Sequence, residues 1–385
     1  MDFYSTNSLS WDKLEYGTDA IQNLHYGLIH VGLPTMIDLS KDKLPNITSG
    51  NIPKNYELCQ EGDIAFADAS EDTNEVAKAV EFYKLNGKAV ICGLHTIHGR
   101  DNQQKTVVGY KGYAFSSTAF HHQIRRIAQG TKIYSINSKN FSECYIGVPS
   151  KEEQRKIATL LRLIDERIAT QNKIIEDLKK LKSAISKLLF MRKDLLETTI
   201  RLADIATLKN GFAFQSSKYN ILGKWKIITI ANVSGGRYIN EEDCNCIINL
   251  PNDIQDHQVL KEGDILISLT GNVGRVSLCK SGAYLLNQRV GLLQIEENID
   301  KEFLYQILSS RRFENSMVAC GQGAAQMNIG KGDVENFVLP YSSNANNIHL
   351  VARILHSYDE CIMNELRELT LLTMQKQYFL AQMFI

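Results

Sequence analysis

Asn, Gln and Arg side chains gather beside glycine-rich turns in the second half of the chain. Asn and Gln amides can form two hydrogen bonds with an adenine edge, and an Arg guanidinium can do the same with guanine. Turn formation alone explains any single one of these residues, because Asn and Gly favour turns. As a group they favour a surface that contacts DNA bases. The group comprises Asn272, Arg275, Asn287, Gln288, Arg289, Gln322, Gln326 and Asn328.

Histidine and cysteine pairs raise the question of a metal site. A zinc site needs four ligands at a recognised spacing, and no set of these pairs supplies it. We therefore expect no metal site, and interpret His95, His98 and Arg100 as hydrogen-bonding groups on a loop. One set is His95, His98, His121 and His122, which lie close in sequence, and the other is Cys244 with Cys246.

The common motifs of catalytic sites are missing from the sequence. There is no GxxxxGK[ST] phosphate loop, no GxGxxG cofactor turn after a strand, and no GxSxG nucleophile turn. An Asn/Asp-Pro-Pro-aromatic motif, which adenine methylation would need, is also missing. The acid–acid–Lys pattern of nucleases is too loose to exclude. We expect a protein without a catalytic centre or a cofactor of its own.

Composition narrows the class of protein further. Lys and Arg number 43 and so do Asp and Glu, which counts against an indiscriminate nucleic-acid or membrane binder. The eight cysteines form no CxxC, so we expect reduced thiols. No run of 18 apolar residues predicts a membrane span, and residues 1–10 do not resemble a signal peptide. These features favour a cytoplasmic protein without a membrane partner.

One long helix is predicted over residues 150–194. Ser150 and Glu153 form a capping-box pattern, and neither Gly nor Pro follows until the end of the segment. The segment holds 12 basic and 7 acidic residues, which suits either a solvated helix surface or a contact face. Apolar residues at a 3.5-residue period mark a coiled-coil seam. The seam positions are Ile157, Leu161, Ile164, Ile168, Gln171, Ile175, Leu178, Lys182, Ile185 and Leu189.

The same seam recurs 194 residues later, in a second helix predicted over 342–385. Its polar interruptions match, Glu365 with Gln171 and Lys376 with Lys182, which indicates an internal duplication. We expect the two helices to pair with each other in antiparallel orientation; two independent helices are the alternative. The second set is Val351, Leu355, Tyr358, Ile362, Glu365, Leu369, Leu372, Lys376, Phe379 and Met383.

Each helix follows a segment of ordinary domain size, residues 1–149 and 195–341. Both segments show short β-type runs broken by Gly, Asn and Asp, and Glu-Gly-Asp-Ile occurs in both, at 61–64 and 262–265. The predicted fold is α+β: two mixed α/β domains joined by two long helices in an antiparallel coiled coil, with pseudo-two-fold symmetry.

The pattern resembles the specificity subunits of type I restriction-modification systems over nearly the whole chain. The resemblance is carried by Pro149–Gln154 leading into Lys156–Ala158 and by the helix ends 187–190 and 381–384. It also rests on short sequence motifs within the two domains. These motifs add further candidate DNA contacts to the group of Asn, Gln and Arg residues given above. These additions are His25, Tyr26, Thr96, Asn210, Phe212, Gln215 and Thr270, together with His95, His98 and Arg100. One departure is clear: Asn347-Ile348 stands where Glu153-Gln154 would recur.

The resemblance implies a division of labour between subunits. The chain would be a non-catalytic subunit whose two target-recognition domains each read one half of a split site in double-stranded DNA. The long helices would act as a spacer on which two copies of a methyltransferase subunit dock, bringing S-adenosylmethionine. A motor-nuclease subunit could join, in the cytoplasm of a bacterium or archaeon. Alternatives are a fused restriction enzyme–methylase, against which the missing motifs argue, and a non-DNA scaffold carrying two binding modules.

Overall fold

The computed structural model describes residues 1–18, 20–321 and 327–384. The chain divides into two compact units. The first comprises Met1–Asn172 with Glu368–Ile385, and the second comprises Lys173–Arg367. The two long helices, α4 (Lys151–Met191) and α8 (Ala345–Gln382), contribute residues to both units. Among the described residues, no helix has the length and apolar character that a membrane crossing requires.

The first unit is built around a sheet in the order β1-β10-β6-β8-β4. The Glu61–Asp63 turn, with Gly62 at φ +87°, feeds the buried strand β6. A second sheet has the order β2-β5-β3-β9, and β11 pairs with β7. The strands are β1 (Asp2–Tyr4), β2 (Leu14–Glu15), β3 (Gln22–Leu24), β4 (Met36–Asp38), β5 (Asn46–Ile47), β6 (Ile64–Ala67), β7 (Ala69–Ser70), β8 (Ala79–Lys84), β9 (Val90–Cys92), β10 (Thr96–Arg100) and β11 (Tyr134–Ser135).

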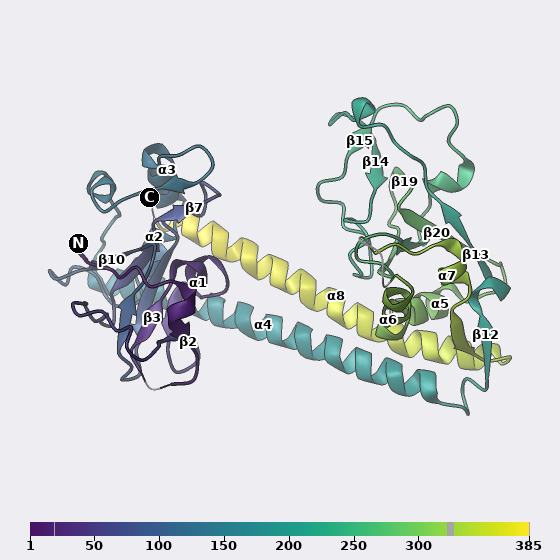
Figure 1. Ribbon diagram of the computed structural model, residues 1–385, viewed down its shortest axis with the longest axis horizontal. Coiled ribbons are helices and arrows are strands. Elements are labelled where there is room, and N and C mark those ends of the chain that lie inside the picture. Colours follow the sequence, from purple (N-terminus) through teal and green to yellow (C-terminus); the bar gives the residue numbers. More distant parts are fainter. Residues whose placement is uncertain (19, 322–326, 385) are drawn as a thin grey trace. The chain divides into compact units, whose positions relative to one another are not determined.

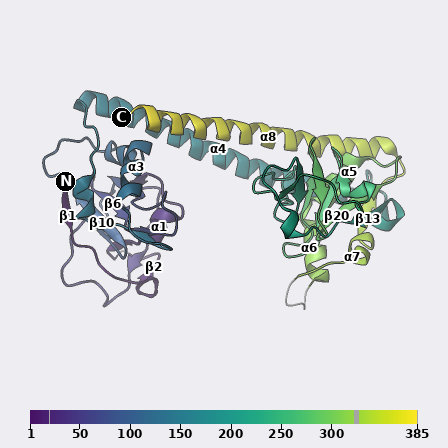
Figure 2. The same cartoon turned by 90° about the horizontal axis from the view of Figure 1, so that it is seen from above.

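Short helices cover the two faces of the first sheet (Figure 2). Side chains alternate along β6. Ala65 and Ala67 pack with Ile29 of α1 on one face, whereas Phe66 packs with Phe120 of α3 on the other. The helices are α1 (Tyr26–His30), α2 (Lys111–Phe115) and α3 (Thr118–Ile127).

The second unit repeats this plan with sheets in the orders β13-β20-β17-β18 and β15-β14-β19-β16, while β12 pairs with β21. Its strands are β12 (Thr198–Arg201), β13 (Ala206–Asn210), β14 (Trp225–Ile228), β15 (Cys246–Ile247), β16 (Val259–Leu260), β17 (Ile265–Ser268), β18 (Val276–Leu278), β19 (Tyr284–Leu286), β20 (Val290–Ile295) and β21 (Val338–Tyr341). Its short helices are α5 (Lys301–Leu308), α6 (Arg311–Cys320) and α7 (Lys331–Glu335). Figure 1 shows these helices on one side of the unit and β14, β15 and β19 on the other.

Matching backbone hydrogen bonds reveal the common topology of the two units. After β6, Asp68 N–H donates to the carbonyl of His95; after β17, Leu269 N–H donates to the carbonyl of Arg289. β3 pairs with β9 in parallel, as β14 does with β19. Such shared contacts define corresponding residues, so that His95 corresponds to Arg289. The duplication predicted from the helices therefore extends through both domains.

Within the first unit, residues 151–172 of α4 pack antiparallel to residues 368–384. Ile157 and Leu161, near the start of α4, share a core with Leu380 and Phe384, near the end of the chain. At the centre of this contact, Lys376 Nζ lies 2.6 Å from Asp165 Oδ1.

Within the second unit, the later part of α4 packs antiparallel to the early part of α8. Ile185 and Leu189 lie against a core that contains Val351 and Leu355. Lys182 Nζ donates to Asp359 Oδ1 at 2.6 Å. This ion pair repeats the Lys376–Asp165 pair, since both members are offset by 194 residues. The antiparallel pairing predicted from the seam is confirmed within each unit, and every seam position is buried or half-buried.

Residues at the start of the two long helices explain the departure noted at Asn347-Ile348. The Gln154 side chain, fully buried, accepts from Val107 N–H at 2.8 Å and donates to the carbonyls of Lys105 and Pro149. Its counterpart Ile348 is buried instead in the apolar core of the second unit. The first unit thus has a set of hydrogen bonds at this position, and the second unit has an apolar contact instead.

We expect Asp359→Leu to destabilise the chain by about 3–5 kcal/mol, because Lys182 and Arg237 lose a buried partner. Adding Lys182→Met should recover part of that loss. Denaturant unfolding followed by circular dichroism measures both effects. The exposed α4 residue Asp177 supplies the control: Asp177→Leu should shift the midpoint little. Equal midpoints for Asp359→Leu and Asp177→Leu would contradict this role of the ion pair.

Candidate nucleic-acid interface

Three candidates of the second unit meet where β17 ends and β20 begins. Thr270 forms a bridge with Asn328, and its hydroxyl donates to Asn328 Oδ1 at 2.9 Å. The carbonyl of Arg289 is held by Leu269 N–H at 3.1 Å, which leaves the Arg289 side chain exposed. Thr270 is buried and acts as a support, whereas Asn328 and Arg289 are accessible to a ligand.

A second group of candidates lies along the adjoining segment after β13. Phe212 and Asn287 form a bridge, and the Phe212 carbonyl accepts from Gln288 N–H at 3.0 Å. This approach requires glycine at 211, because a Cβ there would lie 2.2 Å from the Asn287 carbonyl oxygen. Gln288 and Asn210 are exposed, and Asn287 is half-buried.

An open groove of about 730 Å³ continues this surface. Phe212 and Gln215 line it, with Lys218 and Tyr219 beside them and the segment 247–253 opposite. Aromatic rings and a lysine in one groove suit stacking on bases and contact with phosphate. Gln215 and Phe212 therefore line the same groove.

The turn between β17 and β18 carries Asn272 and Arg275. Gly271 and Gly274 adopt φ values of +74° and +76°, and this leaves Asn272 exposed at the tip. Arg275 is half-buried, with Nε 3.8 Å from a Glu314 carboxylate oxygen. Two further candidates, Gln322 and Gln326, lie outside the described residues.

In the first unit, the structure brings His25, Tyr26 and His95 together. The Tyr26 ring lies 4.8 Å from the His25 ring and 5.1 Å from the His95 ring, centroid to centroid. The half-exposed Trp11 lies 4.5 Å from His25 and extends the cluster. Burial, and next the charge of His95, lower the pKa of His25, which favours the neutral ring. Tyr26 and His95 can stack on, or form hydrogen bonds with, an extended polar ligand, whereas His25 is buried and supports them.

His95 is the most accessible member of this cluster. Its backbone has φ +54°, a conformation that residues with a Cβ rarely adopt. Its Nδ1 lies 3.1 Å from Asp68 Oδ1, and half of its side chain is exposed. Thr96, in contrast, is buried, and its hydroxyl donates to the carbonyl of Gly93 at 2.6 Å. Thr96 thus supports the loop that carries His95.

His98 and Arg100 do not lie on the loop to which the sequence assigned them. Both belong to β10, and His98 is fully buried. Arg100 binds Asp63 and Glu57, and the hydrogen bond to Asp63 raises the pKa of the guanidinium. Burial raises the pKa of Asp63, but hydrogen bonds from His98 and Arg100 outweigh it and lower the pKa overall. Neither His98 nor Arg100 is free for a base contact in this conformation.

Sequence reasoning also missed a group that forms around His98. Cys59, Cys92 and His98 lie buried together, with one potential ligand atom from each within 4.8 Å of the others. Of these three residues, only His98 belongs to the histidine and cysteine sets that the sequence suggested for zinc. Cys59 and Cys92 are 33 positions apart, so spacing carried no signal for this group.

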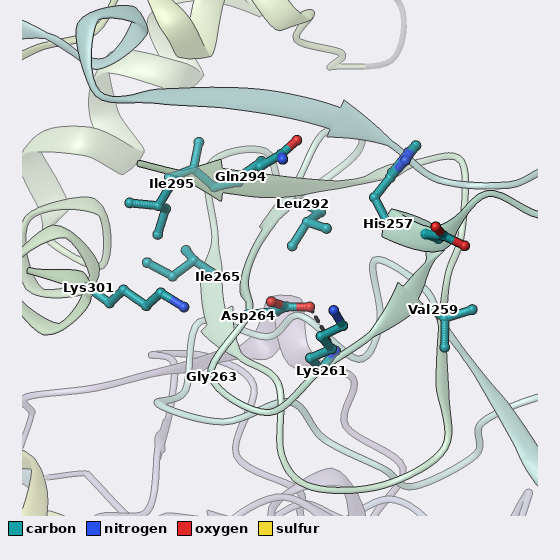
Figure 3. Close-up of a pocket in the computed structure, with 12 residues that line it drawn as sticks. His257, Val259, Lys261, Gly263, Asp264, Ile265, Leu292, Gln294, Ile295 and Lys301 are labelled. Carbon is teal, nitrogen blue, oxygen red and sulfur yellow. Dashed lines mark hydrogen bonds between the residues drawn. The ribbon is translucent and has the colours of Figure 1, made fainter. Parts of the chain in front are cut away.

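A cavity of about 320 Å³ lies in the second unit beside Asp264 (Figure 3). Asp264 Oδ2 accepts from Lys261 N–H at 2.8 Å, and burial raises the pKa of the Asp264 carboxyl. Lys301 extends toward it from α5. Apolar side chains, including Leu292, complete the lining. None of the described DNA-contact candidates lines this cavity, so it lies outside the candidate interface.

The family model and the relatives that match this chain all concern the specificity subunits of type I restriction systems. A family model described as the type I restriction modification DNA specificity domain matches residues 43–180 and 197–373. The type I restriction enzyme MjaVIII specificity subunit of Methanocaldococcus jannaschii is 28% identical over 264 residues. That alignment covers 62% of this chain and 61% of the relative, so the chain spans about three fifths of that protein. A putative MjaX specificity subunit of the same organism is 24% identical over 295 residues, 72% of this chain and 67% of the relative.

Solved structures share the fold. A type I restriction-modification S subunit from M. genitalium has a TM-score of 0.57 at 17% identity, with 100% of this chain and 93% of that chain covered. A chain from a structural study of complex assembly and conformational transition in the type I R-M system has a TM-score of 0.56 at 16% identity, with coverages of 90% and 89%. The predicted fold class is confirmed by these likenesses and by the topology of each unit.

The exposed and the buried candidate side chains should react with chemical labels at different rates. Diethyl pyrocarbonate should modify His95 quickly and His98 slowly, because His98 is buried and bonded to Asp63. An arginine-specific dicarbonyl should likewise modify Arg289 before Arg100. Peptide mass spectrometry over a time course gives the four rates. Comparable rates for His95 and His98 in the folded chain would contradict the interface described here.

Proposed function

The chain belongs to the type I restriction modification DNA specificity domain family, and from this premise we propose that it is the DNA-reading subunit of such a system. In this proposal the chain has no catalytic centre and binds no cofactor itself. Each of its two domains reads one half of a split site in double-stranded DNA. Methyl transfer to adenine in each half belongs to partner subunits.

The proposal rests on one position of the repeated sheet, which carries a different side chain in each of the two domains. The residue before β10 is His95, and the corresponding residue before β20 is Arg289. Both are exposed, and both are held by the same backbone hydrogen bond. Imidazole and guanidinium groups differ in size, charge and donor pattern. Two domains of one fold with unlike side chains at this position suit a DNA site whose halves differ in sequence.

Neighbouring residues support base contacts in each domain. Arg289 is accompanied by the exposed side chains of Gln288 and Asn328, which match the donor and acceptor patterns of purine edges. His95 is accompanied by the rings of Tyr26 and His25. The neutral net charge suits a subunit whose partners supply much of the phosphate contact.

Apolar side chains exposed on the long helices support the proposal that other subunits dock there. In the first unit, Leu371, Met374 and Tyr378 are each more than 60% exposed. In the second unit, Leu181 and Leu188 are also exposed. We propose that two copies of a methyltransferase subunit bind this helical surface and bring S-adenosylmethionine, and that a motor-nuclease subunit can join them.

Two alanine substitutions test the proposal, each on one half of the DNA site. Arg289→Ala should weaken discrimination at one base pair of one half-site by about 5- to 150-fold, because a bidentate contact contributes about 1–3 kcal/mol. His95→Ala should change only the other half-site. The measurement is single-molecule sequencing of methylated adenines in cells that express the chain with its methyltransferase partner.

Arg201→Ala and His122→Ala are matched controls, because both residues are exposed and lie outside the candidate interface. They should leave the methylated sequence unchanged. The proposed assignment would fail if either test variant altered both half-sites. It would also fail if the methylated sequence were the same for all four variants. A scaffold that does not read DNA would give the second result.

The proposal also predicts how the isolated chain behaves toward the cofactor. Calorimetry should detect no binding of S-adenosylmethionine to the purified chain, since the sequence carries no recognised motif for it. Addition of the methyltransferase subunit should produce binding. Stoichiometric micromolar binding to the isolated chain would overturn this part of the proposal.

A further inference from the structure

Three potential metal ligands converge in the core of the first unit. Cys59 follows the loop after β5, Cys92 ends β9, and His98 lies in the middle of β10. Cys59 N–H donates to the carbonyl of Val90 at 2.8 Å, which fixes Cys59 beside β9. All three side chains are buried, at 5%, 2% and 0% exposure. Backbone pairing thus brings together residues that are far apart in the sequence.

The distances suit a tetrahedral thiophilic cation. The two sulfur atoms are 3.6 Å apart, and a ring nitrogen of His98 lies within 4.8 Å of both. Two thiolates bound to zinc at about 2.3 Å would be about 3.8 Å apart in tetrahedral geometry. A disulfide needs a separation of about 2.05 Å, far shorter than the one observed.

Asp63 prepares the His98 ring for such a role. His98 Nε2 lies 2.7 Å from Asp63 Oδ2, and because a carboxylate can only accept, Nε2 carries the proton. In the neutral ring Nδ1 then presents its lone pair, and this atom is buried and has no hydrogen-bond partner among the described residues. A ligand histidine normally donates its second N–H to a carboxylate or carbonyl in this way. Asp63 is itself fixed by Arg100 and by Gln60 N–H.

The duplicated domain shows what the same positions contain when no ligand set is present. Cys59, Cys92 and His98 correspond to Leu260, Leu286 and Leu292, which lie in one apolar core. Asp63 corresponds to Asp264, and each carboxylate accepts from the backbone N–H three residues earlier. In Figure 3, Leu292 lies near Asp264 in the place where the first unit has an imidazole. The fold therefore needs only leucines here, and the polar set is particular to the first unit.

We propose that Cys59, Cys92 and His98 bind one Zn²⁺ ion, with a trapped water as the fourth ligand. Binding releases the two thiol protons to solvent, and no redox change is involved. The ion would join the segment before β6 to β9 and β10, on both sides of the loop 93–95 that presents His95. This inference goes beyond the proposed function and does not depend on it.

The test begins with the full-length chain, purified under reducing conditions without chelators. Elemental analysis should find one zinc per chain. Cobalt(II) in place of zinc should give the thiolate-to-cobalt charge-transfer absorption of a tetrahedral site. A wild-type chain that binds neither ion, while its circular dichroism is that of a folded protein, would overturn the proposal. So would six rather than eight reactive thiols in a chain purified without a reductant and then denatured, because that count indicates a disulfide.

Variants separate this site from the other cysteines. The triple variant Cys59→Leu, Cys92→Leu, His98→Leu copies the second unit, so it should fold and bind no zinc. Asp63→Asn should weaken zinc binding about 10- to 100-fold in competition with a chromophoric chelator. Cys320→Ala and Cys361→Ala, at exposed positions, should retain the full zinc content. Zinc that persists in the folded triple variant, or that disappears with Cys320 or Cys361, would place the metal elsewhere and sink the inference.

Discussion

A lysine–aspartate ion pair across the two long helices, present once in each unit, sets the register on which the remaining packing depends. Apolar seams alone leave the register of two helices weakly defined, because a slip by one heptad again brings apolar residues together. Lys182 with Asp359, and Lys376 with Asp165, satisfy their charges in only one alignment. A slipped pair would leave four half-buried or buried charges without partners, at a cost of several kcal/mol.

The same two aspartates also attach each domain to its helices. Asp165 accepts a hydrogen bond from the Tyr113 hydroxyl at 2.9 Å, and Asp359 accepts one from the Gln306 amide at 2.7 Å. Tyr113 belongs to α2 and Gln306 to α5, so in each unit a short helix is bonded to the aspartate. In the second unit, Arg237 adds a further contact to Asp359. Each domain is therefore bonded to the same aspartate that sets the helix register. The helix register thus also determines where the strand ends of that domain lie relative to its helices.

The long helices and the duplication could be predicted from sequence because their signals are local and periodic. The seam positions repeat every 3.5 residues, and Lys182 and Lys376 interrupt it at matching places. The partners of those lysines could not be predicted, since Asp165 and Asp359 lie outside the seam and find their lysines only through the antiparallel alignment.

Strand pairing limited what could be said about the interface. His95 and His98 are three residues apart, yet His95 precedes β10 and is exposed, whereas His98 lies inside that strand and is buried. The start of β10 decides this difference, because His98 lies inside the strand whereas His95 lies on the loop before it, and the sequence alone does not give that boundary. The meeting of Cys59 with Cys92 depends on pairing between distant segments, for which residue type and spacing carry no information.

Because Gln154 and Ile348 differ, a domain that fits one long helix does not fit the other equally well. A first-unit domain moved by recombination onto the second helix would bring the Val107 N–H and the Lys105 carbonyl to an isoleucine that can bind neither. The opposite move would place a core shaped for isoleucine against an amide. Buried backbone groups without partners cost about 1–3 kcal/mol each. Shuffling between equivalent positions of related chains should therefore be tolerated in evolution more readily than transfer from one half of a chain to the other.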